Sequence, residues 1–237
     1  MKSAPVILAV VSLFSIEVLS AEGVQERLDA RSAEFAEKVP PELKASQRKA
    51  AEDLRATGIV EKAMKVGDLA PDFTLKDHEG REVKLSTVLE RGPVVLTWYR
   101  GGWCPYCNIA LQSWVEANPE ILKRGATLVA LTPELPDATA ATVEEHGLPF
   151  VVLTDLNHTV AERFGLVFDL DANTAERYEE KFQLSRKNGE AAGAKLPLPA
   201  TYVITPDRKI AYAFLDVDYK KRAEPAEVLK VLDGLRK

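Results

Sequence analysis

The two cysteines of this chain, Cys104 and Cys107, constrain its fold most strongly, because two residues separate them and the 237-residue sequence has no other cysteine. A disulfide between them would close a loop of only four residues, which removes little entropy from the unfolded chain. The pair therefore cannot hold a fold together. The fold must rest on a hydrophobic core, for which 46% of the residues are available, and the thiols are left for chemistry.

Composition narrows the class of protein. The chain has 28% charged residues and a formal net charge of −5, values that argue against a disordered chain, a multi-pass membrane protein or a collagen-like repeat. The acidic balance also argues against a nucleic-acid-binding protein, which usually carries a basic face. The length allows one large domain or two small ones.

The first 21 residues are similar to a secretory signal peptide. Lys2 is followed by a largely apolar run over 4–16, and the small residues Ser20 and Ala21 form a cleavage position. The run is shorter than the roughly 20 apolar residues of a membrane span, and an uncleaved anchor is the alternative. We expect export to the periplasm or another extracytoplasmic compartment, with no stable membrane insertion once the leader is cleaved. If the signal is not used, the protein would be cytoplasmic.

Residues 22–63 are predicted to form a helical extension. Apolar residues recur at helical spacing from Val24 to Val39, two prolines interrupt the pattern, and a second helical pattern follows over 42–56. An amphipathic helix most often covers the core of its own domain, so we interpret the extension as packing on the main domain. The alternative is an arm that binds a partner, which leaves homodimerisation open.

From residue 64 to residue 237, short apolar runs rich in β-branched residues alternate with helical patterns, and two runs near the end are joined by a Pro-Asp turn. This alternation predicts an α/β fold with a mixed central sheet flanked by helices. Strands are expected over 73–75, 82–85, 94–99, 127–131, 150–153, 201–204 and 209–215, and helices over 105–123, 138–146, 158–164, 171–186 and 224–235.

The cysteines lie where a strand turns into a helix. The strand over 94–99 is followed by Gly101 and Gly102, and a helix is expected to begin at Cys104 with Pro105 in its first position. The first turn of a helix has unpaired N–H groups and a positive dipole end, both of which favour a thiolate. Cys104 is therefore predicted to be the nucleophile, and Cys107, one turn further along, the resolving thiol.

Several segments resemble the alkyl hydroperoxide reductase/thiol-specific antioxidant (peroxiredoxin) family of the thioredoxin-fold superfamily. The resemblance covers residues 64–237 and rests on four segments in order: Val66 to Leu75, the string from Tyr99 to Cys107, the loop from Leu198 to Ile204, and the segment from Arg222 to Leu229. It implies a thioredoxin-like fold. It also implies that Arg222 holds the thiolate or polarises the peroxide, and that Pro199 is a cis-proline opposite the cysteines.

Two further residues are candidates for the site. Trp103 is expected to shield the sulfur from water, and Arg100 to contact substrate, although Arg100 could instead form a salt bridge at the end of its strand. Arg222 could equally be a surface residue beside two lysines. The sequence departs from the family pattern P-x-x-x-T-x-x-C, because Gly101 stands three residues before Cys104 and Cys104 stands three residues before Cys107.

These features predict a thiol-dependent peroxidase that reduces hydrogen peroxide or organic hydroperoxides. Cys104 would become a sulfenic acid, form a disulfide with Cys107 and be regenerated by thioredoxin or a similar thiol. The alternatives are an exported thiol-disulfide oxidoreductase that acts on protein disulfides and a non-catalytic redox-sensing module. We expect no metal, haem or flavin, because zinc normally needs four ligands and the three histidines lack a ligand spacing.

Overall fold

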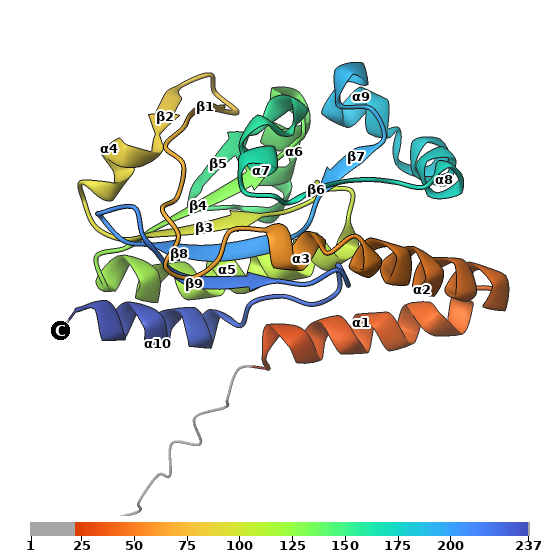
Figure 1. The fold of residues 1–237 in the computed structure, drawn as a ribbon, viewed down its shortest axis with the longest axis horizontal. Coiled ribbons are helices and arrows are strands. Elements are labelled where there is room, and N and C mark those ends of the chain that lie inside the picture. Colours follow the sequence, from red (N-terminus) through yellow and green to blue (C-terminus); the bar gives the residue numbers. More distant parts are fainter. Residues whose placement is uncertain (1–21, 237) are drawn as a thin grey trace, which may run out of the picture.

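The computed structural model describes residues 22–236, so the leader expected over 1–21 lies outside the described residues. Its centre is a mixed seven-stranded sheet (Figure 1). The strands β3, β4 and β5 are parallel, whereas β1, β8 and β9 run antiparallel to their neighbours. In sheet order the strands are β2 (Glu82–Lys84), β1 (Thr74–Asp77), β5 (Val151–Thr154), β4 (Thr127–Thr132), β3 (Val94–Trp98), β8 (Ala200–Ile204) and β9 (Ile210–Leu215). The sequence prediction of an α/β fold with a mixed sheet is confirmed.

The central strand β3 is buried along its whole length, because helices cover both faces of the sheet. Successive side chains of a strand point to opposite faces, so Leu96 and Trp98 join one core and Val95 joins another. The first core is completed by α3 (Ile59–Lys62), α4 (Leu85–Leu89) and α7 (Thr159–Arg163). The opposite face is covered by α1 (Val24–Lys38), α5 (Pro105–Lys123), α6 (Pro136–His146) and α10 (Pro225–Leu235).

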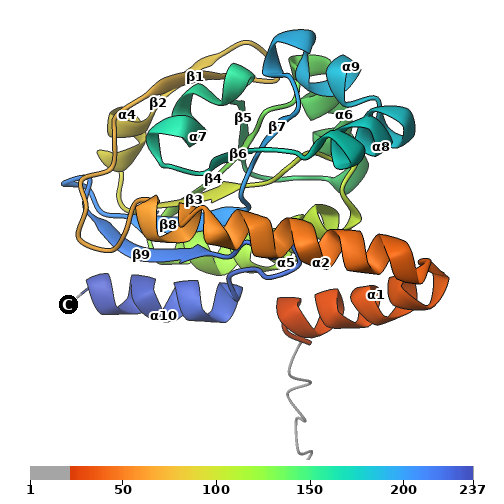
Figure 2. The same cartoon turned by 45° about the vertical axis from the view of Figure 1, so that its right-hand side comes forward.

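The N-terminal helices extend beyond the sheet (Figure 2). Helix α1 packs on α5 and buries Val24 and Leu28, and the side chain of Glu224 accepts hydrogen bonds from the amides of Val24 and Gln25 at 3.0 and 2.9 Å. A carboxylate at the first turn of a helix satisfies N–H groups that have no intrahelical partner. Helix α2 (Pro41–Ala56) has no fully buried residue.

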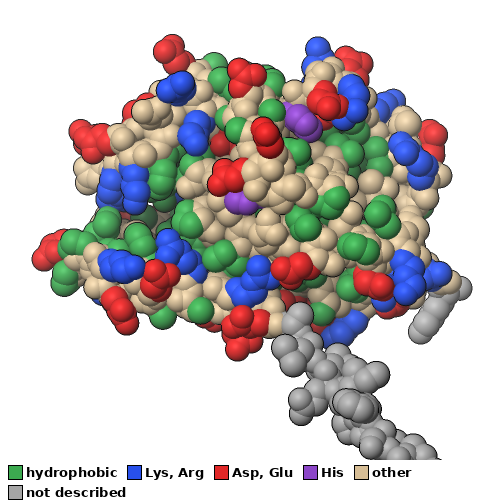
Figure 3. All heavy atoms as spheres, turned by 180° about the vertical axis from the view of Figure 1, so that it is seen from behind, with side chains coloured by type: hydrophobic (Ala, Val, Ile, Leu, Met, Phe, Trp, Pro, Cys, Tyr) green, Lys and Arg blue, Asp and Glu red, His purple; other side chains and the backbone are tan. Residues whose placement is uncertain are grey.

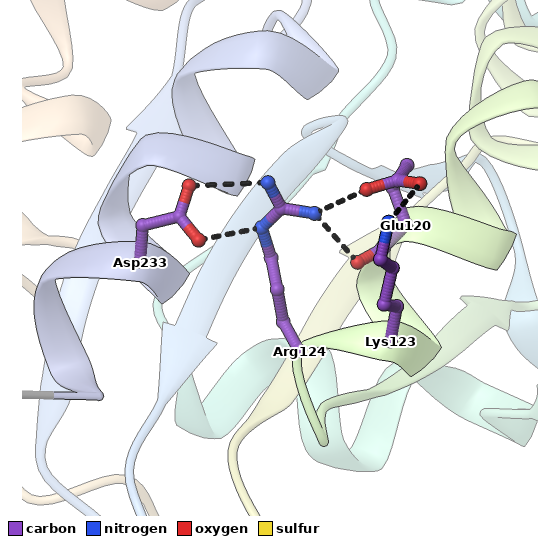
Figure 4. A network of polar contacts seen from close by, with 4 residues as sticks. All are labelled: Glu120, Lys123, Arg124 and Asp233. Atoms are coloured by element: carbon purple, nitrogen blue, oxygen red, sulfur yellow. Dashed lines mark hydrogen bonds and ion pairs between the residues drawn. The ribbon is translucent and has the colours of Figure 1, made fainter.

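The C-terminal helix is fixed to α5 by apolar packing and by one polar network. Val228 and Leu232 of α10 lie in the same core as Trp114 and Ile121 of α5. At the end of α5, Arg124 donates to both carboxylate oxygens of Asp233 and to Glu120, and Lys123 contacts Glu120 as well (Figure 4). This packing holds α5, the helix that carries both cysteines, against the sheet.

The helix α4 was not expected from the sequence, and two further regions differ from the prediction. The helix expected over 171–186 is interrupted at Gln183, whose φ of +54° is left-handed, so it forms α8 (Ala172–Phe182) and α9 (Leu184–Asn188). The segment after α9, for which no strand was expected, contains β7 (Lys195–Pro197), which pairs with β6 (Val167–Asp169) in a small second sheet. Both strands have three residues, too few to show a periodic pattern.

The surface is mixed in charge. Figure 3 shows acidic and basic side chains interspersed over the face seen from behind. Among residues 22–236, no helix has the length and hydropathy of a membrane span.

Candidate active site

Both cysteines lie in the first turn of α5, as the sequence predicted. Cys104 is the N-cap residue, with an extended backbone, and Pro105 occupies the first helical position. Both are free thiols, and Cys104 and Cys107 are 2% and 0% exposed. Neighbouring side chains therefore cover both sulfurs.

The turn before the cysteines requires its two glycines. Gly101 has a φ of +144°, and a Cβ there would collide with Trp103. A Cβ on Gly102 would collide with the hydroxyl of Thr142. The peptide of Gly102 is held on both sides, because its N–H donates to Oε2 of Glu134 at 2.9 Å and its carbonyl accepts from Nδ2 of Asn108 at 2.9 Å. The close packing fixes where α5 begins.

Arg222 reaches the site from the loop before α10. Its guanidinium donates from Nη2 to Sγ of Cys107 at 3.5 Å, and Nη1 donates to the carbonyls of Tyr219 and Lys221. Only 8% of Arg222 is exposed, so it is not the surface residue that the sequence left open. The backbone carbonyls hold the guanidinium in place and direct its charge at Cys107.

Arg100 lies on the other side of the cysteines. It is 2% exposed, and its guanidinium carbon stands 5.0, 5.3 and 4.4 Å from the ring centres of Trp103, Tyr178 and Tyr219. Nη2 donates to the hydroxyl of Tyr178 at 2.9 Å. The ion pairs found within 22–236 do not include Arg100, so the salt bridge considered from the sequence is wrong. Its charge rests on aromatic faces, to which a guanidinium is attracted.

The two thiols differ in acidity. Burial raises the pKa of Cys107, but a hydrogen bond from Cys104 and the charges of Arg222 and Arg100 outweigh burial and lower that pKa to about 5. Burial and the hydrogen bond to the Cys107 thiolate raise the pKa of Cys104 well above its ordinary value. These directions, together with the hydrogen bond from Arg222 to Cys107, favour Cys107 over Cys104 as the thiolate, which is the opposite of the order expected from the start of the helix.

Trp103 shields the site as part of an aromatic cover. Its ring lies 5.4 Å from that of Tyr178 and 4.8 Å from that of Phe182, both on α8. Pro199 is buried beside the site, directly before β8. The expectation of a cis-proline is wrong, because residues 22–236 contain no cis peptide bond. The trans form is the intrinsically favoured state of an X-Pro bond, and a proline that leads into a strand needs no other.

A cleft connects this site with the N-terminal helices. It has a volume of about 1180 Å³, and its lining includes Arg100, Tyr106, Pro199 and Tyr219 at the site and Phe35 of α1. Residues of α2 and α8 form its walls as well. The N-terminal extension therefore borders a cleft that reaches Arg100 and Tyr106 beside the cysteines.

Sequence reasoning missed three residues of the site: Tyr178, Tyr219 and Glu134. The two tyrosines come from segments far from the cysteines in the sequence and carry no motif. Glu134 lies just after the carboxyl end of the central parallel strand β4. Functional residues often lie at such strand ends, and this position was the one available signal for Glu134. When the family pattern P-x-x-x-T-x-x-C is aligned so that it ends at Cys107, Cys104 takes the threonine position and Arg100 the proline position. This alignment was a sequence signal that Cys107 takes the position of the reactive cysteine. Within 22–236, no three His, Cys, Asp or Glu side chains are grouped as metal ligands.

Comparison with known proteins defines the class to which this fold and site belong. The model of the AhpC/TSA family matches residues 66–213, which is more than half of the chain, so the chain belongs to that family. Its thioredoxin-like, peroxiredoxin-type fold agrees with solved structures: peroxidoxin BcpB from Mycobacterium tuberculosis is similar with a TM-score of 0.58 and 25% identity, over 73% of this chain and 99% of that one.

Two curated relatives are similar over the central part of the chain. Chloroplastic peroxiredoxin Q from Sedum lineare is 32% identical over 117 residues, which are 49% of this chain and 62% of that protein. Peroxiredoxin Bcp from Escherichia coli strain K12 is 29% identical over 103 residues, which are 44% of this chain and 65% of that protein. The chain thus spans less than two thirds of the length of these two relatives.

Proposed function

We propose that this protein is a thiol-dependent peroxidase in which Cys107 attacks the peroxide and Cys104 resolves the product. The observation that carries the proposal is the contact between the Arg222 guanidinium and Sγ of Cys107 in a buried site. A thiolate with a fixed cation beside it is a nucleophile at neutral pH. Membership of the AhpC/TSA family and the similarity to proteins named peroxiredoxin Q and Bcp support the same activity.

The reaction begins with the Cys107 thiolate. Its sulfur attacks the terminal oxygen of a hydroperoxide, the O–O bond breaks, Cys107 becomes a sulfenic acid, and the alkoxide or hydroxide leaves and takes up a proton. The charges of Arg222 and Arg100 stabilise the departing oxyanion. Cys104 then attacks the sulfenic sulfur, its proton leaves with the hydroxyl as water, and a Cys104–Cys107 disulfide forms. Two thiols of thioredoxin or a similar reductant restore the pair.

Burial of the cysteines favours this function over exchange with protein disulfides. A peroxide is small enough to enter the cleft, whereas a folded disulfide-bonded protein must bring its own sulfur into contact with a thiolate that is 0% exposed. Cys104, at 2% exposed, is covered by residues that include Trp103. Reduction by thioredoxin then requires that the start of α5 opens after the disulfide has formed.

We also propose that the N-terminal 21 residues direct export of the protein, and that the helical extension over 22–63 is where two copies of the chain would contact each other in a homodimer. The basis is the apolar run over 4–16 and the small residues before position 22. Sequencing the N-terminus of protein purified from a periplasmic fraction tests export, and a chain that keeps Met1 in the cytoplasmic fraction would contradict it. Size-exclusion chromatography with light scattering gives the oligomeric state.

The peroxidase proposal is tested by peroxide consumption with thioredoxin, thioredoxin reductase and NADPH. Cys107→Ser should abolish turnover and leave no thiol that hydrogen peroxide oxidises rapidly. Cys104→Ser should lose turnover but still form one sulfenic acid per chain, which a dimedone trap and mass spectrometry locate at residue 107. A sulfenic acid at Cys104 in the Cys107→Ser variant would show that the roles are reversed. Equal, slow peroxide consumption by the wild type and both variants would refute a peroxidase.

A further inference from the structure

Glu134 is a buried carboxyl group that the proposed reaction does not use. It lies in the bend between β4 and α6 and is 1% exposed. Its Oε2 accepts from the amide of Gly102 at 2.9 Å and stands 3.5 Å from the hydroxyl of Thr132. The ion pairs found within 22–236 do not include Glu134. A carboxylate this deep with so few partners is costly to keep ionised.

The position of Glu134 connects it with the cysteines. It holds the amide of the residue two places before Cys104, and the carbonyl of that same residue is bound to Asn108, the residue after Cys107. A Cβ on Gly101 would stand 2.9 Å from Oε1 of Glu134, so the carboxyl is pressed against the turn that presents both sulfurs. A change in its charge therefore acts on the start of α5.

Titratable groups from three elements face this carboxyl. Cys107 of α5 is near enough for its thiolate to disfavour the Glu134 carboxylate, and Lys187 of α9 favours it. The phenol of Tyr99, which follows β3, is buried beside both and stays protonated. Burial and the Cys107 thiolate together raise the pKa of Glu134 to about 7, against the lowering effects of the Gly102 hydrogen bond and Lys187. Two anions in one enclosed region oppose each other.

We propose that Glu134 is the proton-coupling residue of the cysteine pair, which binds a proton while Cys107 is a thiolate and releases it when the pair is oxidised to a disulfide. Glu134 is a positioning residue in this role, because it acts through the charge on Cys107. The proposal rests on the dithiol chemistry of the proposed function, although not on peroxide as the substrate.

The proton balance gives the consequence. Between about pH 5 and pH 7, the reduced site contains a Cys104 thiol, a Cys107 thiolate and a protonated Glu134. Forming the disulfide removes two electrons from the two sulfurs, one proton from Cys104 and one proton from Glu134. A disulfide reagent takes up the two electrons and the two protons as it is reduced to a dithiol. In Glu134→Gln the same oxidation removes two electrons but only the one proton of Cys104.

Equilibration with reduced and oxidised dithiothreitol between pH 5.5 and 7 tests this difference. Dithiothreitol releases two protons when it is oxidised, whereas reduction of the Glu134→Gln disulfide binds only one. The reaction therefore releases one net proton, and the equilibrium constant for reducing the variant should rise by about tenfold per pH unit. The wild-type constant should rise much less. The fraction reduced is measured by alkylation and mass spectrometry. Asp137→Asn, which removes an exposed carboxylate three residues away, is the matched control and should behave as wild type.

Infrared difference spectroscopy of the wild-type protein provides a second measurement that needs no variant to fold. A protonated-carboxyl band should be present in the reduced protein and diminished in the oxidised protein. Equal slopes for wild type and Glu134→Gln, or a protonated-carboxyl signal that does not respond to oxidation, would overturn the proposal. No step uses peroxide, so a protein that shows the coupling but consumes no peroxide would retain this inference and refute the peroxidase.

Discussion

Replacing Arg222 by Met removes the cation beside Cys107 while keeping an unbranched apolar stem in its place. The lost interaction is the hydrogen bond from Nη2 to Sγ at 3.5 Å inside a buried site. A hydrogen bond to a charged group contributes about 1.5–3 kcal/mol, and one pKa unit corresponds to about 1.36 kcal/mol. The pKa of Cys107 should therefore rise by about one to two units, from about 5 to about 6–7.

The size of the effect depends on pH. At pH 5.5, a thiol with a pKa of 5 is about three-quarters ionised, and one with a pKa of about 6.5 is about one-tenth ionised, so reactivity falls by about eightfold. At pH 8 both are almost fully ionised. A loss of peroxidase activity that persists at pH 8 then measures the missing stabilisation of the departing oxyanion, for which removal of one donor costs about 10²-fold or more.

The assay is the rate of iodoacetamide alkylation against pH in a Cys104→Ser background, where Cys107 is the single thiol and the serine hydroxyl still donates to it. Lys221→Met is the matched control, because Lys221 is the exposed neighbour of Arg222. The midpoint should move only in the Arg222 variant. A midpoint that stays near pH 5 after Arg222→Met would refute the assignment of Arg222 as the thiolate partner.

Three further predictions concern stability. Because its pKa is raised, Glu134 keeps a proton in the folded state that it loses in the unfolded chain. Its contribution to the free energy of unfolding is therefore complete below about pH 4.5 and is lost by about pH 7, a change of about 3 kcal/mol. Urea unfolding across that range should show a smaller loss of stability in Glu134→Gln than in the wild type. Gly102→Ala should cost about 1–3 kcal/mol through its collision with Thr142, and Thr142→Ala in the same chain should recover part of it. Arg124→Ala should cost about 1 kcal/mol at low salt and less at high salt, because its partners Glu120 and Asp233 are half exposed (Figure 4).

The regular part of the fold follows from local sequence. The strand β3 is a continuous apolar run, and the helix after it begins at a Pro in the first position, so both were predictable from a few neighbouring residues. The break at Gln183 was not, because a left-handed glutamine carries no sequence signal; across the break, the Glu179 carboxylate accepts hydrogen bonds from the amide and hydroxyl of Ser185. The pairing of β6 with β7 joins segments almost 30 residues apart, which no local pattern specifies.

For the candidate site, as for the fold, local sequence features were predictable and long-range contacts were not. Its two cysteines are three positions apart in the sequence and were found from that spacing alone. The burial of Arg100 among aromatic rings was not predictable, because Tyr178 and Tyr219 contact it only in the folded chain. Trp103 was identified as a shield, and the structure gives it partners on α8. What the sequence lacked was the set of contacts across the fold, which the linear order of residues does not contain.

The order of the two thiols shows how a long-range contact can outweigh a local one. At the start of a helix, the dipole favours an anion by about 0.3–1 kcal/mol, and this was the reason to assign the attack to Cys104. A charged hydrogen bond in a buried site contributes about 1.5–3 kcal/mol, and the structure directs the one from Arg222, 115 residues away, at Cys107. The larger contribution decides which sulfur is ionised. Because both thiols compete for one shared proton, stabilising the Cys107 thiolate also keeps Cys104 protonated until a sulfenic acid forms beside it.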